Sequence, residues 1–121
     1  MTDTQRRKYS RIHFNSGARL SIGAVETLCE VLDLSLKGAL LQIAEGPLPV
    51  VGETCLLEIE LDADGPTIRM EGEIAHGEGT RIGLMCREID LDSITHLRRL
   101  LELNLGDPEL LNREFSALID N

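Results

Sequence analysis

At 121 residues and 13.4 kDa, the chain has room for one domain built around one hydrophobic core. Its composition, 42% hydrophobic and 27% charged, is that of a globular protein, and no apolar run reaches the roughly 18–20 residues of a membrane-spanning helix. The formal net charge is −9 and residues 1–5 lack the apolar centre of a signal peptide, so we expect a cytoplasmic protein that does not engage a membrane.

Basic residues are concentrated at the N-terminus. Residues 1–11 hold four Arg or Lys and one Asp, a net charge of +3, whereas residues 12–121 hold eight basic and twenty acidic residues, a net charge of −12. We interpret residues 1–11 as a flexible basic arm on an acidic body. Such an arm is suited to closing over an anion if the body supplies a wall to close against. Its basic residues are Arg6, Arg7, Lys8 and Arg11.

Alternating apolar and polar residues predict six short antiparallel strands within residues 18–89. They are expected at residues 19–22, 27–35, 39–43, 55–62, 68–74 and 81–87. In the fourth of these, Cys55, Leu57, Ile59 and Leu61 alternate with acidic residues. Gly72 indicates a bulge or a tight bend of the kind that closes small barrels. We therefore expect a six-stranded antiparallel β-barrel.

After Asp90 the hydrophobic period changes from 2 to 3.6, which predicts one or two C-terminal helices over residues 92–120. Asp92 is the expected N-cap of the first helix and Gly106 its end, and Asp107-Pro108 predicts the start of the second. Arg98 and Arg99 are expected on a solvated face. The predicted fold is mainly β with C-terminal α, in one domain over residues 1–121. The apolar stripes, which should cover part of the barrel or a partner, are Ile94, Leu97, Leu100, Leu101 and Leu105, then Leu111, Phe115 and Leu118.

Residue types that carry catalysis or bind metal are scattered. Cys29, Cys55 and Cys86 are odd in number, far apart and in strand-like stretches, which favours reduced, buried thiols over disulfides or a metal site. The histidines are isolated, and neither of the common glycine-rich phosphate-binding motifs occurs. We expect no enzyme activity, no metal and no cofactor.

A binding constellation is more suggestive. Asp33 and Ser35 are two residues apart on a strand, so they share a face, which alternation makes the same as that of Cys29 and Val31. Gly38 permits a positive φ or the close approach of a ligand ring. A carboxylate can accept from the N–H edge of guanine, and arginines bind guanine O6/N7 or phosphate. Alternatively, Asp33 and Ser35 form a turn with their own backbone.

Arg7-x-x-x-Arg11 followed by Asp33-x-Ser35-x-x-Gly38 resembles the two-part signature of PilZ domains, bacterial receptors for cyclic di-GMP. The resemblance covers essentially the whole chain and implies the family's six-stranded barrel with a C-terminal helix. It implies that Arg7 and Arg11 hold guanine and phosphate. Asp33 and Ser35 would contact the opposite face of a guanine, and Gly38 would leave space for it.

Three further residues follow from the same resemblance. Arg6 matches relatives with an additional arginine before the motif, which bind two intercalated ligand molecules. Lys8 would be a supporting phosphate contact. His76 lies near the place where some relatives have an aromatic residue that packs on the ligand, although the alternation after Ile74 favours a core or rim position for it instead.

The resemblance implies a cyclic di-GMP receptor or adaptor in which ligand clamps the arm on the barrel and changes a surface read by an unidentified downstream protein. One alternative is an adaptor of the same fold that does not bind nucleotide. The other is a nucleic-acid binder that uses the arm, against which the acidic body and the scarcity of aromatic residues argue. We expect a monomer or weak dimer.

Overall fold

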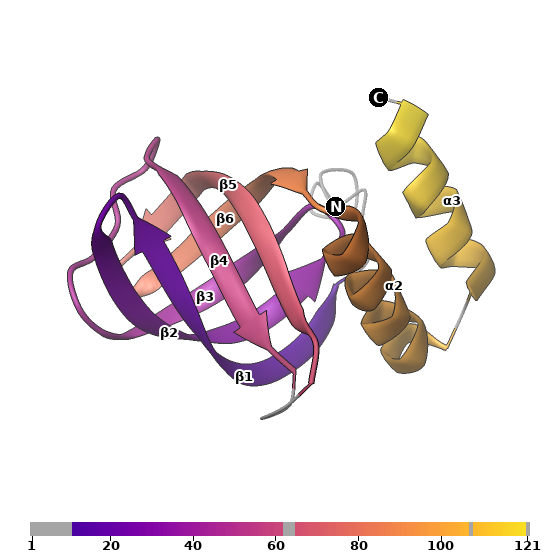
Figure 1. Cartoon of the computed structure of the whole chain (residues 1–121), viewed down its shortest axis with the longest axis horizontal. Helices are drawn as coiled ribbons and strands as arrows, with labels where there is room; N and C mark the ends of the chain where they lie inside the picture. Colours follow the sequence, from indigo (N-terminus) through magenta and orange to yellow (C-terminus); the bar gives the residue numbers. More distant parts are fainter. Residues whose placement is uncertain (1–10, 62–64, 107, 121) are drawn as a thin grey trace.

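Six antiparallel strands close into a barrel in the computed structural model, which describes residues 11–61, 65–106 and 108–120 (Figure 1). Around the barrel the order is β1-β2-β3-β6-β5-β4, and β4 pairs with β1 to close it. The predicted fold is confirmed. The elements are β1 (Ile12–Ile22), β2 (Val25–Ser35), β3 (Gly38–Glu45), β4 (Thr54–Glu60), β5 (Thr67–Glu78), β6 (Arg81–Ile89), α2 (Leu91–Leu105) and α3 (Pro108–Asp120).

The core follows the alternation of the strands. On β4 the residues predicted to face inward are buried and their neighbours in sequence are more exposed, and β5 and β6 also bury alternate residues. Because aromatic residues are scarce, the interior is filled by aliphatic side chains. The largest fully buried ones are Leu20, Leu34, Leu36, Leu41, Leu57, Ile59, Ile68, Met70, Ile74, Ile82, Leu97 and Leu101.

The first strand starts earlier than predicted, at Ile12 rather than near residue 18. Ile12 is buried and pairs with Leu34, but the register shifts between His13 and Ser16. This irregularity interrupts the alternation, so the sequence pattern is visible only beyond it. The correction matters for the arm, because Arg11 directly precedes a barrel strand. Arg6, Arg7 and Lys8 lie outside the described residues.

Gly72 has the role predicted for it. The pairing of β5 with β6 shifts register between Glu71 and Gly72, and a Cβ on Gly72 would lie 2.2 Å from the carbonyl oxygen of Met85. Only a residue without a side chain allows β6 to pass this close.

The three cysteines are free and buried, as predicted. Burial raises the pKa of each thiol from 9.0 to about 11, which leaves it protonated and poorly nucleophilic near neutral pH.

Helix α2 (Leu91–Leu105) begins two residues earlier than predicted, because Asp90 and not Asp92 is its N-cap. The Asp90 carboxylate accepts from the backbone N–H of Ser93 at 3.0 Å and from its hydroxyl at 2.7 Å. The same hydroxyl accepts from the N–H of Arg69 on β5 at 2.9 Å, so the cap also joins the helix to the barrel. The helix ends at Gly106, as predicted, with φ +71° and an N–H that donates to Glu102 O at 3.0 Å.

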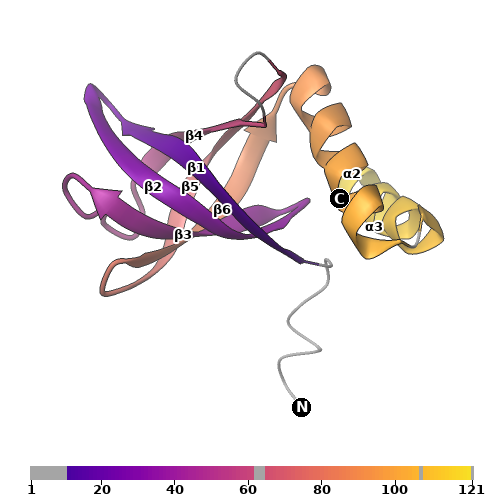
Figure 2. The ribbon, with the colours of Figure 1, turned by 90° about the horizontal axis from the view of Figure 1, so that it is seen from below.

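The two helices have different neighbours. Helix α2 packs its buried Leu97 and Leu101 on the barrel, and α3 lies along the outer side of α2 (Figure 1). Figure 2 shows both helices at the barrel end where β6 leads into α2. Asp107, the predicted cap of α3, lies outside the described residues. Within the described ranges, neither helix is long and apolar enough to cross a membrane.

Candidate ligand-binding site

A bulge in β2 turns the polar residues of the predicted site outward. Val31 pairs with Leu41 of β3 and Asp33 pairs with Leu40, so Leu32 has no partner of its own. Val31 and Leu34 are both 0% exposed although they are three residues apart. Asp33 and Ser35 therefore share a face, as predicted, but it is the outer face. Their predicted continuity with Cys29 and Val31 was wrong, because the bulge reverses the alternation between the two pairs.

Strand register carries this outer face across four strands, β2, β3, β6 and β5. With neighbouring strands about 4.8 Å apart, a row of four paired residues spans about 14 Å. Two such rows lie side by side. One row is Ser35, Gly38, Met85 and Glu73, and the other is Asp33, Leu40, Gly83 and His76.

All members of the two rows except Glu73 line an open hollow of about 450 Å³, within the roughly 300–1,000 Å³ typical of small-molecule sites. Arg11 and Lys37 lie at the β2 side, and His76 and Met85 lie on the β5 and β6 side. Gly38 and Gly83 occupy the middle of the floor and contribute no side chain. The floor therefore alternates between bare backbone at these two glycines and the apolar side chains of Leu40 and Met85.

Arg11 and Asp33 face each other at the edge of the hollow. Arg11 Nη1 lies 3.9 Å from Asp33 Oδ2, and the side chains are 38% and 14% exposed. This distance exceeds that of a hydrogen bond, so the pair is held by a solvent-screened attraction of small strength. An anion placed between the strand and the arm could compete for this guanidinium without breaking a strong bond.

Ser35 shapes the β2–β3 turn. Its hydroxyl accepts from the N–H of Lys37 at 3.2 Å and donates to Gly38 O at 3.4 Å. The side chain is buried. For this residue the turn interpretation holds, and Ser35 positions Lys37 at the edge of the hollow and Gly38 in its floor.

Gly38 is required by the barrel itself. Glycines with positive φ occur elsewhere among the described residues, but Gly38 is not one of them, so the first of its two predicted roles does not apply. A Cβ at this position would lie 2.0 Å from the carbonyl oxygen of Leu84. The close approach that Gly38 allows is thus between β3 and β6 of this chain.

His76 lies on the outer surface, contrary to the prediction of a core or rim position. Ile74 pairs with Leu84 and His76 with Gly83, so Ala75 is an extra residue that reverses the alternation. His76 is exposed and lines the hollow with Arg11 and Asp33. The histidine and the motif residues, 38 or more positions apart in sequence, share one site.

Lys37, Leu40 and Met85 also line the hollow but were not predicted. Lys37 lies between the motif residues Ser35 and Gly38, so its place in the turn could have predicted that it lines the site. Leu40 and Met85 reach the hollow only through strand register, which no local pattern shows. In the described part of the chain, no three His, Cys, Asp or Glu side chains come together as a metal site would require.

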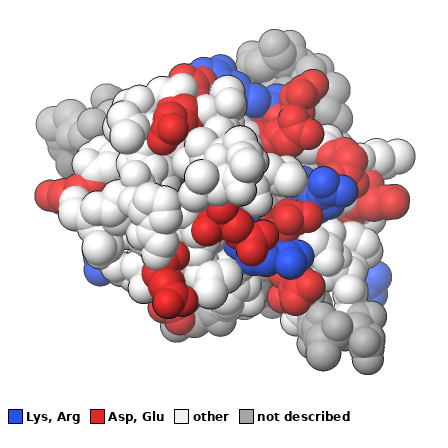
Figure 3. Space-filling model, turned by 60° about the vertical axis from the view of Figure 1, so that its left-hand side comes forward, with Lys and Arg blue, Asp and Glu red and all other residues white. Residues whose placement is uncertain are grey.

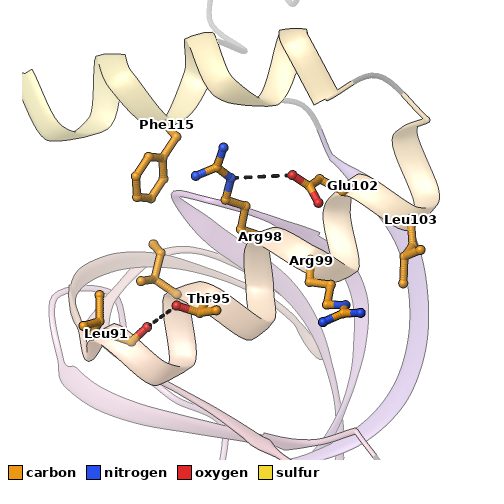
Figure 4. Close-up of a pocket in the computed structure, with 8 residues that line it drawn as sticks. Leu91, Thr95, Arg98, Arg99, Glu102, Leu103 and Phe115 are labelled. Carbon is orange, nitrogen blue, oxygen red and sulfur yellow. Dashed lines mark hydrogen bonds and ion pairs between the residues drawn. The ribbon is translucent and has the colours of Figure 1, made fainter.

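A second hollow, of about 500 Å³, lies between α2 and α3 and contains none of the predicted site residues (Figure 4). Its polar side chains make hydrogen bonds and ion pairs within and between the two helices. Thr95 donates to Leu91 O at 2.8 Å, and Arg98 lies 3.7 Å from Glu102. Arg98 also donates to Asn112 and stacks 4.8 Å from the centre of the Phe115 ring. Arg98 therefore joins the helices, and its predicted place on a solvated face was wrong.

Known proteins share this architecture. A family model for the PilZ domain matches residues 5–103. The crystal structure of the PilZ domain of CeSA from a cellulose synthesizing bacterium is similar with a TM-score of 0.61 and 16% sequence identity, covering 80% of this chain and 96% of that one. The Bacillus subtilis inhibitor of motility, MotI/DgrA, is similar with a TM-score of 0.63 and 22% identity, covering 81% of this chain and 52% of that one. This chain thus spans about half of the second protein.

At these identities the two structures show a shared fold and no more. The family model adds the sequence evidence, since it extends from the basic arm through the barrel and nearly the whole of α2. The chain belongs to the PilZ domain family.

Proposed function

We propose that this protein is a receptor for cyclic di-GMP and acts by binding, not by catalysis. The observation that supports this most is the meeting of Arg11, Asp33, Ser35, Gly38 and His76 around one outer hollow. These residues come from β2, β3, β5 and the position just before β1, and they bring a cation, an acceptor, a glycine and an imidazole together.

Each group has a partner in a guanine dinucleotide. Asp33 accepts from the guanine N–H edge, and Arg11 donates to phosphate or to guanine O6 and N7. The glycine floor receives the base, and His76 packs against it from β5. Arg7 adds a second guanidinium, with Lys8 as a supporting phosphate contact. Arg6 supports a stoichiometry of two intercalated ligand molecules.

Ligand binding orders the arm in this proposal. Each charge-assisted hydrogen bond contributes about 1.5–3 kcal/mol, and fixing each arm residue costs about 1–2 kcal/mol. Three or four such bonds are therefore needed to offset the ordering of the arm. The clamped arm then presents a new surface beside the barrel, which a downstream protein in the cytoplasm reads.

Isothermal titration calorimetry with cyclic di-GMP, cyclic di-AMP and GTP tests the proposal. We expect saturable binding of cyclic di-GMP alone. Arg11→Ala and Arg7→Ala each weaken it at least about 10- to 100-fold, because each removes one or more charge-assisted bonds. Arg99→Ala is the matched control, an exposed arginine on α2 away from the hollow. Unchanged affinity in Arg11→Ala would refute the assignment of the site.

An adaptor that does not bind nucleotide is the second candidate. It is favoured by the structural roles of two motif residues, since Ser35 holds a turn and Gly38 permits β3 to approach β6. A folded wild-type protein that gives no heat with cyclic di-GMP would support this candidate over the first.

A further inference from the structure

The end of the barrel farthest from the helices displays apolar side chains. Eight large hydrophobic residues are exposed in the described part of the chain, and four of them lie here: Val25 (49%), Leu48 (50%), Val50 (64%) and Val51 (58%). We call these four residues the barrel-end patch. They come from the β1–β2 turn and the β3–β4 loop, at the left of Figure 1.

The patch contains a groove of about 260 Å³. Its walls are Ile22 and Val25 from one connection and residues 47–50 from the other, with Glu53 at the edge. The groove has room for one or two apolar side chains of a partner. A cluster of exposed apolar residues around a groove is typical of a protein interaction site.

The loop that carries the patch is firmly held. Val50 N–H donates to Glu53 Oε1 at 2.7 Å, and Gly52 N–H donates to Ile74 O of β5 at 2.8 Å. At the start of the loop, Thr27 donates to Pro47 O at 3.3 Å. Val50 and Val51 are thus displayed by a hydrogen-bonded backbone, which lowers the ordering cost of binding.

Acidic residues border the patch. The strand ends and connections at this end of the barrel carry Glu26, Glu45, Glu53 and Glu78, against Arg81 as their one basic residue. Figure 3 turns this end toward the viewer and shows a broad uncharged area bordered mainly by Asp and Glu. The border favours a cationic partner. It repels an anionic membrane, and it repels a second copy docked patch to patch, because Glu would face Glu.

We propose that the barrel-end patch docks a protein segment that presents apolar side chains flanked by Lys or Arg. This surface shares no residue with the hollow that we assign to cyclic di-GMP. It gives the protein a second binding site at the opposite end of the barrel from the β2–β3 turn, available with or without nucleotide.

A synthetic amphipathic helix of Leu and Lys serves as the probe, titrated into the full ¹⁵N-labelled chain. A Leu/Glu peptide and an Ala/Lys peptide are the controls for charge and for apolar contact. We expect the largest amide shifts at residues 22–27 and 46–53, with the Leu/Lys peptide alone. Shifts centred on α2 and α3, or equal binding of either control peptide, would overturn the proposal.

Val50→Asp separates groove binding from simple charge attraction. The variant adds a negative charge, so a peptide held by charge alone would bind more tightly. A peptide held by the apolar contact should bind at least tenfold more weakly, which is the result we expect. Val50→Ser tests the same contact without a charge. Leu103→Asp, at an exposed position on α2, is the matched control and should bind like the wild type. Unchanged or tighter binding by Val50→Asp contradicts the proposal.

Two further measurements exclude the other occupants. Light scattering should give the same molecular mass for the wild type and for Val50→Asp. The protein should not sediment with vesicles of phosphatidylglycerol. A Val50-dependent dimer or vesicle binding would assign the patch to a second copy or to a membrane instead. Thermal unfolding confirms that each variant is folded. Calorimetry with cyclic di-GMP tests the proposed function, and its result does not bear on peptide binding to the patch.

Discussion

Gly38 shows how one position can serve the barrel and the candidate site together. Its missing side chain allows β3 to lie against the Leu84 carbonyl, and it also leaves bare backbone in the floor of the hollow. A ligand-binding experiment alone would not separate these roles. A stability measurement does, because only the contact with Leu84 exists without ligand.

Gly38→Ala should destabilise the ligand-free protein by about 1–3 kcal/mol, because a Cβ that lies 2.0 Å from Leu84 O forces β3 and β6 apart. Urea unfolding measures this loss. Gly17→Ala is the matched control on β1, where a Cβ meets nothing within 4 Å, and it should be nearly neutral. A Gly38→Ala protein as stable as the wild type would show that the glycine serves the ligand alone.

Single residues also show which orientations could be predicted from the sequence and which could not. The inward residues of β4 were predictable because its alternation is unbroken. The faces of Asp33 and His76 were not, because the bulges at Leu32 and Ala75 each shift the pattern by one residue. Barrel closure determines where a strand bulges, and the local composition around Leu32 and Ala75 does not reveal it.

At the scale of elements, the helices differ in how they are held. Helix α2 buries Leu97 and Leu101 and is joined to β5 through Asp90 and Ser93. Helix α3 contacts α2, and Arg98 is central to that contact. The change of period predicted both helices. The role of Arg98 depended on how α3 folds back, which the spacing of apolar residues does not specify.

Arg98→Ala should release α3 while the barrel stays folded. The change removes the hydrogen bond to Asn112 and the contact with Phe115, which together stabilise the helix pair. Hydrogen exchange of the amides of residues 108–120 should accelerate at least tenfold, while amides of β4 and β5 keep their protection. Arg99→Ala, one residue along the same helix, is the control and should leave α3 protected. Equal exchange in both variants would show that other contacts hold α3.

At the scale of the whole molecule, the barrel has two different ends and a closed interior. The start of β1 and the β2–β3 turn lie at the end that carries the helices, and the barrel-end patch lies at the other. Between them, twelve fully buried large side chains, together with the three cysteines, make one continuous interior. The two proposed sites are therefore joined by one packed core.

The buried thiols make this core sensitive to alkaline pH. In the unfolded chain each thiol loses its proton near pH 9.0, but burial raises the pKa of Cys29, Cys55 and Cys86 to about 11. The folded protein thus binds more protons than the unfolded chain between these values, so its stability is fully present below about pH 9 and falls as the pH rises toward 11. Urea unfolding at a series of pH values from 8 upward measures this decline.

A triple variant with alanine at all three cysteine positions is the matched comparison. It starts less stable because it loses packed sulfur atoms from the core. Lysine and tyrosine titration affects both proteins alike, so the difference between them isolates the thiols. We expect the wild type to lose its advantage steadily above pH 9, as the unfolded thiols ionise. Parallel pH profiles for the two proteins would show that burial of the thiols does not control the alkaline limit of the fold.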